Sequence, residues 1–447
     1  MHKVLQAREE GGTERSFSSL YFEKEGSMKF TNCLLFKNAK QILTMDGSSN
    51  HDVGLIEDGY LFIQNGKISE VGKQNEMDPH IETFPDLKVI DASGKVIVPG
   101  FVDCHTHVVF GGSRVAEYTV KLTDPRPETL EKMGIETGIY ASVHMTRDLP
   151  IQELAAQTEK RVRTMILNGT TTLESKSGYG LTLASEMKML EVNKLLGTVL
   201  PIDIVSTFLG GHGWDERMDK ETYIDSLCNE MIPQVAKFRM AAFNDVWCDE
   251  GHFTAEDSRR ILSVGQQYGL IPTIHTDAYS YIGGSDLAAD MKMASAVHLN
   301  YTPKEVMPKL RDSGVVGVVL PAIDFAVNHP KPFNPRPMLS CGMTIGLATN
   351  CCPGNWCVSM PFVLTLACRR HGFTPAEAFR AATFGSARAL TLTDRGQLLP
   401  GKVADVLLLN VSTFEDVVYQ YGENPIELVV KNGEVIVENH MLLNANP

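Results

Sequence analysis

The sequence has no apolar run long enough to cross a membrane. Its longest apolar stretches, such as residues 95–102 and 314–321, have the length of strands, whereas a bilayer span needs about 20 apolar residues. Clusters of Lys and Arg are also missing, and a formal charge of -13 with a pI near 5.5 argues against a nucleic-acid partner. We therefore expect a protein that acts on a small molecule and has neither a nucleic-acid nor a membrane partner.

The nine cysteines lack the paired C-x-x-C spacings of a structural zinc site. Their number is odd and most stand inside apolar runs, which predicts reduced, buried thiols in a cytoplasmic protein. The one cluster, Cys351, Cys352 and Cys357, is then explained most simply as ordinary loop or core thiols.

A secretory signal is missing from the N-terminal residues, since 1–27 mix both charges and contain no apolar core. We expect these residues to form a mobile, disordered extension, with Met28 beginning the ordered chain.

What the sequence does contain is a repeated alternation of short apolar runs and amphipathic segments. The 447 residues, 43% of them hydrophobic, can bury a large core. Eight apolar runs occur, at 96–107, 170–176, 203–211, 243–250, 271–277, 294–300, 315–321 and 344–350. Helical patterns accompany most of them, for example at 151–168, 184–196, 255–268, 303–311 and 375–390. Eight buried strands alternating with helices predict an α/β fold, a (β/α)8 barrel of the TIM type.

Both ends of the chain have a different, β-rich pattern. Residues 30–91 contain GYLFIQNGKISEVG, and 401–437 contain GKVADVLLLN and LVVKNGEVIV, which are short alternating runs with Asn-Gly turns. We expect the two ends to pair into one small β-sandwich-like domain that the barrel interrupts. This domain would comprise residues 28–96 and 396–447, and the barrel residues 97–395.

Histidines recur where the predicted barrel strands end. His105 and His107 stand at the end of the first predicted strand, and because side chains at i and i+2 share a face of a strand, both should point toward the barrel axis. The ends of the third, fifth and sixth predicted strands carry His212, His275 and His298. Barrel enzymes build their active sites at this rim, and neutral imidazoles are natural ligands of divalent metals. The pattern predicts metal-assisted hydrolysis, in which a nearby base takes a proton from water.

These features resemble the amidohydrolase superfamily, which has HTH after the first strand, single histidines after the fifth and sixth, an interrupted β domain and a segment like GKVAD. Within it, HVVFGGSR, ESKSGYGLTLASEMKML, TFLGGH, RRIL and VSMPFVLTLACR are similar to the imidazolonepropionase family. That family hydrolyses the ring of 4-imidazolone-5-propanoate to N-formimino-L-glutamate in histidine degradation. The resemblance covers roughly residues 30–437.

The resemblance implies a cofactor and a set of site residues. One divalent ion, zinc or iron, would be held by His105, His107 and His275, and His298 would orient water beside it. The positions that would hold the substrate are Arg114, Tyr179 and His212. An arginine fork suits a propanoate because it can bind both carboxylate oxygens. The resemblance is also compatible with a homodimer.

The family pattern breaks at the end of the eighth strand, in ATNCCPGNWCVSMP. The family has an aspartate there that binds the metal and accepts a proton, whereas this sequence has Asn350. An amide can offer its carbonyl oxygen to a metal but cannot take a proton from water at neutral pH. Asn350 is therefore a candidate metal ligand and catalytic residue, but it lacks the basic carboxylate that the family has at this position. Nearby, Ala278 stands where a catalytic polar side chain is expected, and Cys352 replaces an asparagine.

Three explanations remain open. The chain is an active relative that opens another cyclic amide with Asp277, His298 or a Cys351 thiolate as the base, or an imidazolonepropionase with lowered activity, or a catalytically silent ligand-binding homologue. A deaminase of the same superfamily is the nearest enzymatic alternative. It usually needs a glutamate near the fifth-strand histidine, and Ala278 counts against it.

Overall fold

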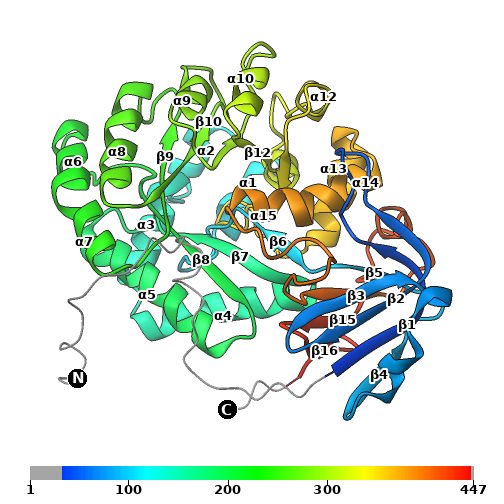
Figure 1. Ribbon diagram of the computed structural model, residues 1–447. Helices are drawn as coiled ribbons and strands as arrows, with labels where there is room; N and C mark the ends of the chain where they lie inside the picture. Colours follow the sequence, from blue (N-terminus) through cyan, green and yellow to red (C-terminus); the bar gives the residue numbers. More distant parts are fainter. Residues whose placement is uncertain (1–32, 444–447) are drawn as a thin grey trace, which may run out of the picture. The chain divides into compact units, whose positions relative to one another are not determined.

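Eight parallel strands form the central sheet of the structure, a computed structural model that describes residues 33–443 (Figure 1). They are β6 (Phe101–Asp103), β7 (Thr170–Lys176), β8 (Asp203–Gly211), β9 (Phe243–Cys248), β10 (Ile271–Thr276), β11 (Ser295–His298), β12 (Val316–Val319) and β13 (Ile345–Leu347). Each strand pairs with its neighbours in chain order. The predicted extension, residues 1–27, and the predicted start at Met28 lie outside the described residues.

Side-chain and backbone hydrogen bonds join the two ends of this sheet just beyond β6 and β13. Thr349 donates its backbone N–H and its hydroxyl to the carboxylate of Asp103, at 3.1 and 2.6 Å. Farther along, the Asn350 N–H donates to the His105 carbonyl at 3.0 Å and the His107 N–H donates to the Cys351 carbonyl at 2.9 Å. The strands therefore form a nearly closed barrel, and the TIM-type prediction is confirmed.

Helices follow most of the strands. Those after the early strands are α1 (Val115–Lys121), α2 (Pro127–Lys132), α3 (Gly138–Asp148), α4 (Ile151–Leu167), α5 (Leu183–Val199), α6 (Lys220–Ser226) and α7 (Ile232–Lys237). The later ones are α8 (Ala255–Gln267), α9 (Gly284–Asp290), α10 (Met307–Asp312), α11 (Pro321–Ala326), α12 (Pro335–Ser340), α13 (Met360–His371), α14 (Pro375–Arg380), α15 (Ser386–Ala389) and α16 (Asp416–Tyr419). Helix α8 starts at a capping box, in which Thr254 and Asp257 exchange side-chain to backbone hydrogen bonds. Within the described chain, no helix is both long and apolar enough to cross a membrane.

Two predicted helices differ from the observed ones. The helix predicted at 303–311 begins only at Met307, because the preceding residues form a turn in which the Val306 N–H donates to the Pro303 carbonyl. The segment predicted as one helix at 375–390 contains a π-helical stretch, Ala381–Gly385, between α14 and α15. A Cβ at Gly385 would lie 1.8 Å from the Ile345 carbonyl oxygen, so this stretch packs directly on β13.

The first predicted strand, 96–107, is in fact divided between two sheets. Its first part, β5 (Val96–Pro99), pairs with β1 and β14 of the second sheet, whereas β6 pairs with β7 of the barrel. Gly100 separates them, and a Cβ there would lie 2.3 Å from the Thr171 hydroxyl oxygen. The domain boundary predicted after residue 96 therefore falls inside β5. The residues on both sides of Gly100 are equally apolar, so the sequence pattern does not mark where the chain passes from the second sheet to the barrel.

The second sheet is built from both chain ends, as predicted. It contains β1 (Cys33–Leu43), β2 (Leu55–Gln64), β3 (Lys67–Lys73), β4 (Leu87–Asp91), β5, β14 (Val406–Leu409), β15 (Ile426–Lys431), β16 (Glu434–Glu438) and β17 (Met441–Leu442). Alternation along β5 gives the sheet two buried faces: Val96 and Val98 belong to the large cluster that contains the barrel residues, and Ile97 belongs to a separate cluster of the sheet.

An ion cluster also connects this sheet to the start of β8. The Lys431 ammonium lies 2.6 Å from Asp203 and 2.7 Å from Asp405, and Arg395 also contacts Asp203. Burial by itself raises the pKa of Asp203, but the two cations outweigh it and lower that pKa to about 2. The cluster therefore stabilises the contact between barrel and sheet through charge as well as through apolar packing.

Candidate metal centre

Three histidines meet at the carboxyl ends of β6 and β10. His105, His107 and His275 are 0, 3 and 2% exposed, and one ring nitrogen of each lies within 4.8 Å of the others. The Nε2 atoms of His107 and His275 are 3.2 Å apart. Burial lowers the pKa of each ring below its ordinary value, so the imidazoles are neutral and have lone pairs to offer. No other set of three or more such side chains within residues 33–443 is arranged to hold a metal.

Unpaired polar atoms at this centre fit a divalent ion. Both ring nitrogens of His105, Nδ1 of His107 and Oδ1 of Asn350 are buried and have no hydrogen-bond partner among the described residues. A buried polar atom without a partner costs about 1–3 kcal/mol. Neutral imidazoles and an amide oxygen are suitable donors for zinc or ferrous iron. The residues present therefore fit the metal that the sequence predicts.

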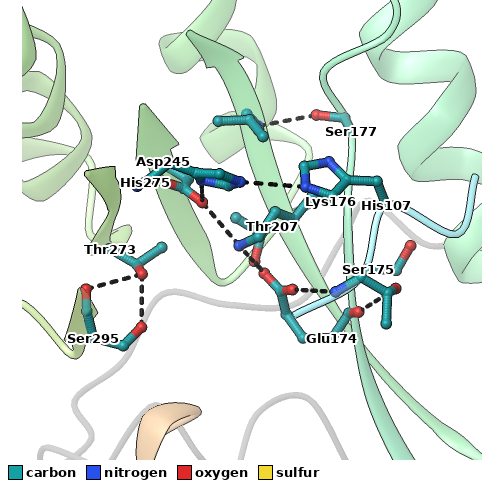
Figure 2. A network of polar contacts seen from close by, with 12 residues as sticks. His107, Glu174, Ser175, Lys176, Ser177, Thr207, Asp245, Thr273, His275 and Ser295 are labelled. Atoms are coloured by element: carbon teal, nitrogen blue, oxygen red, sulfur yellow. Dashed lines mark hydrogen bonds and ion pairs between the residues drawn. The ribbon is translucent and has the colours of Figure 1, made fainter. Parts of the chain in front are cut away.

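A charged network lies beneath the histidines (Figure 2). Asp245 Oδ2 is 2.9 Å from Nδ1 of His275 and 2.8 Å from the ammonium of Lys176. Lys176 also contacts Glu174, whose Oε2 accepts the backbone N–H of Thr106 at 3.3 Å. Burial alone lowers the pKa of Lys176, but the two carboxylates outweigh it and raise that pKa, so the side chain is charged. The network thus joins strands β7, β9 and β10 to the segment that contains His105 and His107.

Three barrel strands end in a left-handed backbone conformation at the site. Asp277, His298 and Asn350 follow or end β10, β11 and β13 with φ of 55, 78 and 48°. Such conformations cost of order 1–3 kcal/mol and cluster at functional sites. They are least unfavourable for Asn and Asp, whose short polar side chains tolerate this region.

His298 lies beside the three histidines, and the backbone N–H of Asn350 donates to the His105 carbonyl at 3.0 Å. The ring centre of His298 is 5.6 Å from that of His275 and 6.0 Å from that of His105, and burial lowers its pKa well below the ordinary value. Asn350 is 5% exposed, and Asn355 donates its side-chain N–H to the Asn350 carbonyl at 3.1 Å. Both positions suit the predicted roles, which remain predictions.

The geometry counts against two of the predicted bases. The carboxylate of Asp277 accepts hydrogen bonds from the hydroxyls of Thr276 and Thr302, at 2.8 and 2.6 Å, and is not part of the histidine group. The left-handed turn at Asp277 explains why its side chain does not continue the strand pattern of His275. Cys351 is fully buried in the apolar core and is also outside the group, and burial raises the pKa of its thiol well above the ordinary value. It is therefore a neutral thiol and no thiolate base.

Two of the predicted substrate residues, His212 and Tyr179, lie beside His107. The ring of His212 stacks on that of His107 with centres 4.9 Å apart, and Tyr179 lies 5.2 Å from His212. Burial lowers the pKa of His212 to about 3, so its ring is neutral. Its Nδ1 lies 3.2 Å from the Gly178 carbonyl, which can only accept, so Nδ1 carries the proton and Nε2 is left as an acceptor.

Arg114 is more constrained than the sequence indicates. Its Nε and Nη2 donate to Glu117 at 2.6 and 2.7 Å. The structure gives Nη1 no partner in the described part of the chain, and this atom lies 3.8 Å from where a Cβ on Gly354 would be. One nitrogen rather than the whole fork therefore faces the loop after β13.

Asp249 and His329 hold the loop that contains Ala278. Asp249 Oδ2 accepts the backbone N–H groups of Ala278 and Tyr279 at 2.9 and 3.0 Å. On the other side, Nε2 of His329 lies 3.0 Å from the Ala278 carbonyl. The loop is thus fixed by its backbone, although the polar side chain expected at Ala278 is missing.

Sequence reasoning missed Glu174, Lys176 and Asp245 as site residues. The available signal was the occurrence of charged side chains in runs that are otherwise typical of buried strands, ESK in β7 and NDVW in β9. Only the closed barrel shows that these side chains meet one another and His275.

Residues 264–436 match the Amidohydrolase family, and with the barrel and its histidines this match makes the chain an amidohydrolase, a hydrolase acting on C–N bonds. The imidazolonepropionase of Geobacillus kaustophilus (strain HTA426) is 39% identical over 421 residues, covering 91% of this chain and 98% of that protein. The imidazolonepropionase of Brevibacillus brevis is 38% identical over 420 residues, covering 91 and 98%. The chain belongs to the imidazolonepropionase family.

Solved structures support the same fold. An adenosine deaminase from Xanthomonas campestris with bound zinc aligns with a TM-score of 0.69 at 16% identity, covering 93% of this chain and 95% of that one. A triazine hydrolase variant aligns with a TM-score of 0.68 at 19% identity, covering 93 and 97%. At these identities the likeness concerns the fold alone.

Proposed function

We propose that this protein is a metal-dependent hydrolase that opens 4-imidazolone-5-propanoate at a ring C–N bond and forms N-formimino-L-glutamate. The observation that carries the proposal is the buried group of His105, His107 and His275 with its unpaired nitrogen atoms, in a chain 39% identical to an imidazolonepropionase. The ion would be zinc or iron. The proposal includes a cytoplasmic location, a small-molecule substrate without nucleic-acid or membrane partners, and a homodimeric state.

The three histidines and Oδ1 of Asn350 would hold the ion. When bound, a divalent ion there supplies polarisation of the ring carbonyl and acidification of water. On the substrate side, Nη1 of Arg114 would bind the propanoate carboxylate, and the Nε2 lone pair of His212 would accept a ring N–H. Tyr179 closes the same side beside His212.

A ring nitrogen of His298 is the proton acceptor that remains for the water. Asn350 has no basic atom, Asp277 is engaged by two hydroxyls, and the Cys351 thiol is protonated. The proton taken by His298 would then pass to the ring nitrogen that leaves. Because burial makes His298 a weak base, we expect slower turnover than a metal-bound carboxylate would allow.

The test is direct turnover. Freshly prepared 4-imidazolone-5-propanoate is incubated with the full chain, metal-free or loaded with zinc or iron, and formiminoglutamate is quantified by mass spectrometry. We expect product only with the loaded protein. Absence of product above buffer at high protein concentration, with the metal bound, would exclude this reaction.

Asn350 also favours a second candidate, a divergent or catalytically silent member of the family that binds an imidazolone-like acid. This candidate predicts saturable binding of the substrate without product. Turnover of another cyclic amide by the loaded protein would indicate a divergent hydrolase instead. Release of ammonia from aminated rings would indicate a deaminase.

A further inference from the structure

Glu174, Lys176 and Asp245 are buried directly beneath the candidate metal centre (Figure 2). Each residue is at most 1% exposed. One ammonium lies between two carboxylates, 2.8 Å from Asp245 Oδ2 and 2.5 Å from Glu174 Oε1. Burying three ionisable groups is costly unless every one of them is paired, so the arrangement requires an explanation beyond packing.

The partners of these groups determine their charges. Oε1 of Glu174 faces the Lys176 ammonium and the Thr207 hydroxyl, and Oε2 faces the Thr106 backbone N–H, so both oxygens accept hydrogen bonds. The ammonium at Oε1 and the backbone N–H at Oε2 favour the carboxylate over the protonated acid. Asp245 likewise faces the ammonium and the backbone N–H of His275, the latter at 3.2 Å from Oδ1. Two carboxylates and one ammonium give the network a net charge of about -1.

The same groups control the orientation of the predicted ligands. Asp245 Oδ2, 2.9 Å from Nδ1 of His275, requires a proton on that nitrogen, which leaves the Nε2 lone pair directed toward His107. At the other end, Glu174 holds Thr106, the residue between His105 and His107, by the backbone N–H and by a 2.7 Å hydrogen bond from the Thr106 hydroxyl to the Glu174 carbonyl. A carboxylate on the far nitrogen of a ligating imidazole fixes its tautomer and raises its basicity.

We propose that Glu174, Lys176 and Asp245 act as one positioning unit, which orients His275 and the His105–His107 segment and supplies the negative charge that Asn350 does not. The proposal rests on the proposed function in one respect, that the histidines hold a divalent ion. Lys176 holds Asp245 and Glu174 in place. The negative charge of Asp245 acts on the metal centre through its contact with His275. A purely structural role, in which the three residues only connect barrel strands, predicts no effect on metal affinity.

The experiment measures the affinity of the full metal-free chain for zinc by competition with a chromophoric chelator. Asp245→Asn by itself leaves Lys176 with one carboxylate fewer and endangers folding. The substitution is therefore also made in a Glu174→Gln/Lys176→Met double variant. That background has no ammonium that could lose its partner, and Asp245 still gives the network a net charge of about -1. Asp203→Asn is the matched control, because it removes a partly buried, lysine-paired carboxylate at the start of β8. Circular dichroism confirms folding of each variant.

We expect Asp245→Asn to weaken zinc binding by about 10–100-fold in both backgrounds, since it leaves the His275 proton on a neutral amide. Asp203→Asn should stay within about threefold of the parent, and the double variant, which keeps Asp245, should lose less zinc affinity than Asp245→Asn does. The visible spectrum of the cobalt(II) form should change with Asp245→Asn and not with Asp203→Asn, because only the former touches a ligand.

Equal zinc affinity of the parent and Asp245→Asn in the double-variant background would overturn the proposal. So would an equally large loss in the double variant before Asp245 is changed, because the charge would then not reside on Asp245. A parent that binds no zinc, iron or manganese would remove the proposed function as well. A parent that binds metal but is indifferent to Asp245→Asn would remove this proposal alone.

Discussion

Restoring a carboxylate at the end of β13 should increase activity and make stability depend on metal. In Asn350→Asp the new side chain has nearly the same shape, and the left-handed φ of 48° suits Asp as well as Asn. The position is 5% exposed, and the present Oδ1 has no hydrogen bond. A carboxylate there would lack a hydrogen-bond partner without metal, and would be both ligand and proton acceptor with metal.

Two opposite effects follow from that environment. Without metal, an unpaired buried carboxylate should lower the free energy of unfolding by about 3 kcal/mol, or raise its own pKa until it is protonated. With metal, a positioned general base contributes about 10²–10⁴-fold to the rate, so kcat should rise within this range. Metal affinity should also rise, because an anionic oxygen replaces a neutral one.

The assay combines thermal unfolding, with and without metal, and formiminoglutamate production. Asn244→Asp is the control, since Asn244 is 1% exposed on β9 and donates to the Ile261 carbonyl. The control should destabilise the protein equally with and without metal, and it should not increase kcat. If Asn350→Asp behaves like the control, the reasoning that places position 350 at the metal centre is wrong.

Three further predictions concern other parts of the chain. Because the pKa of Asp203 is about 2 in the folded protein and 3.8 ordinarily, its ion pairs stabilise the fold above about pH 4, and that contribution is lost as the pH falls toward 2. Denaturant unfolding should show about 2 kcal/mol more acid-dependent loss in the parent than in Asp203→Asn. Arg114→Lys should raise KM for the imidazolone about tenfold with little change in kcat, since it removes a uniform substrate contact, and a fall in kcat alone would refute this role. Cys351→Ala should leave metal content and kcat within about threefold, because a neutral core thiol is neither ligand nor base.

The periodicity of the sequence predicts the barrel well where strands are long. The predicted strands at 170–176 and 203–211 coincide with β7 and β8, because both runs are buried and end at a change of pattern. The run at 96–107 contains two strands. The chain passes from one sheet to the other at Gly100, where the side chain of Thr171 packs closely against the glycine. Close approach is a property of the folded chain and leaves no signal in apolar periodicity.

The sequence predicted the site residues that recur at the ends of barrel strands. It did not predict the residues that contact those site residues from neighbouring strands. His105, His107 and His275 are brought together as expected. Asp277 follows His275 by two residues, so sequence spacing places it on the same face, but its left-handed backbone turns the carboxylate toward Thr302. Asp245 contacts His275 from the neighbouring strand, and such a pair appears only after the barrel has formed.

The central claim, that the three histidines form a metal centre, is tested most directly by the metal content of the full chain. Parent and His275→Ala proteins are saturated with zinc, iron or manganese, freed of excess metal by gel filtration and analysed by mass spectrometry. We predict about one equivalent of metal in the parent and less than about a tenth in His275→Ala. A parent with less than about a tenth of an equivalent, or equal metal contents in the two proteins, would contradict the account.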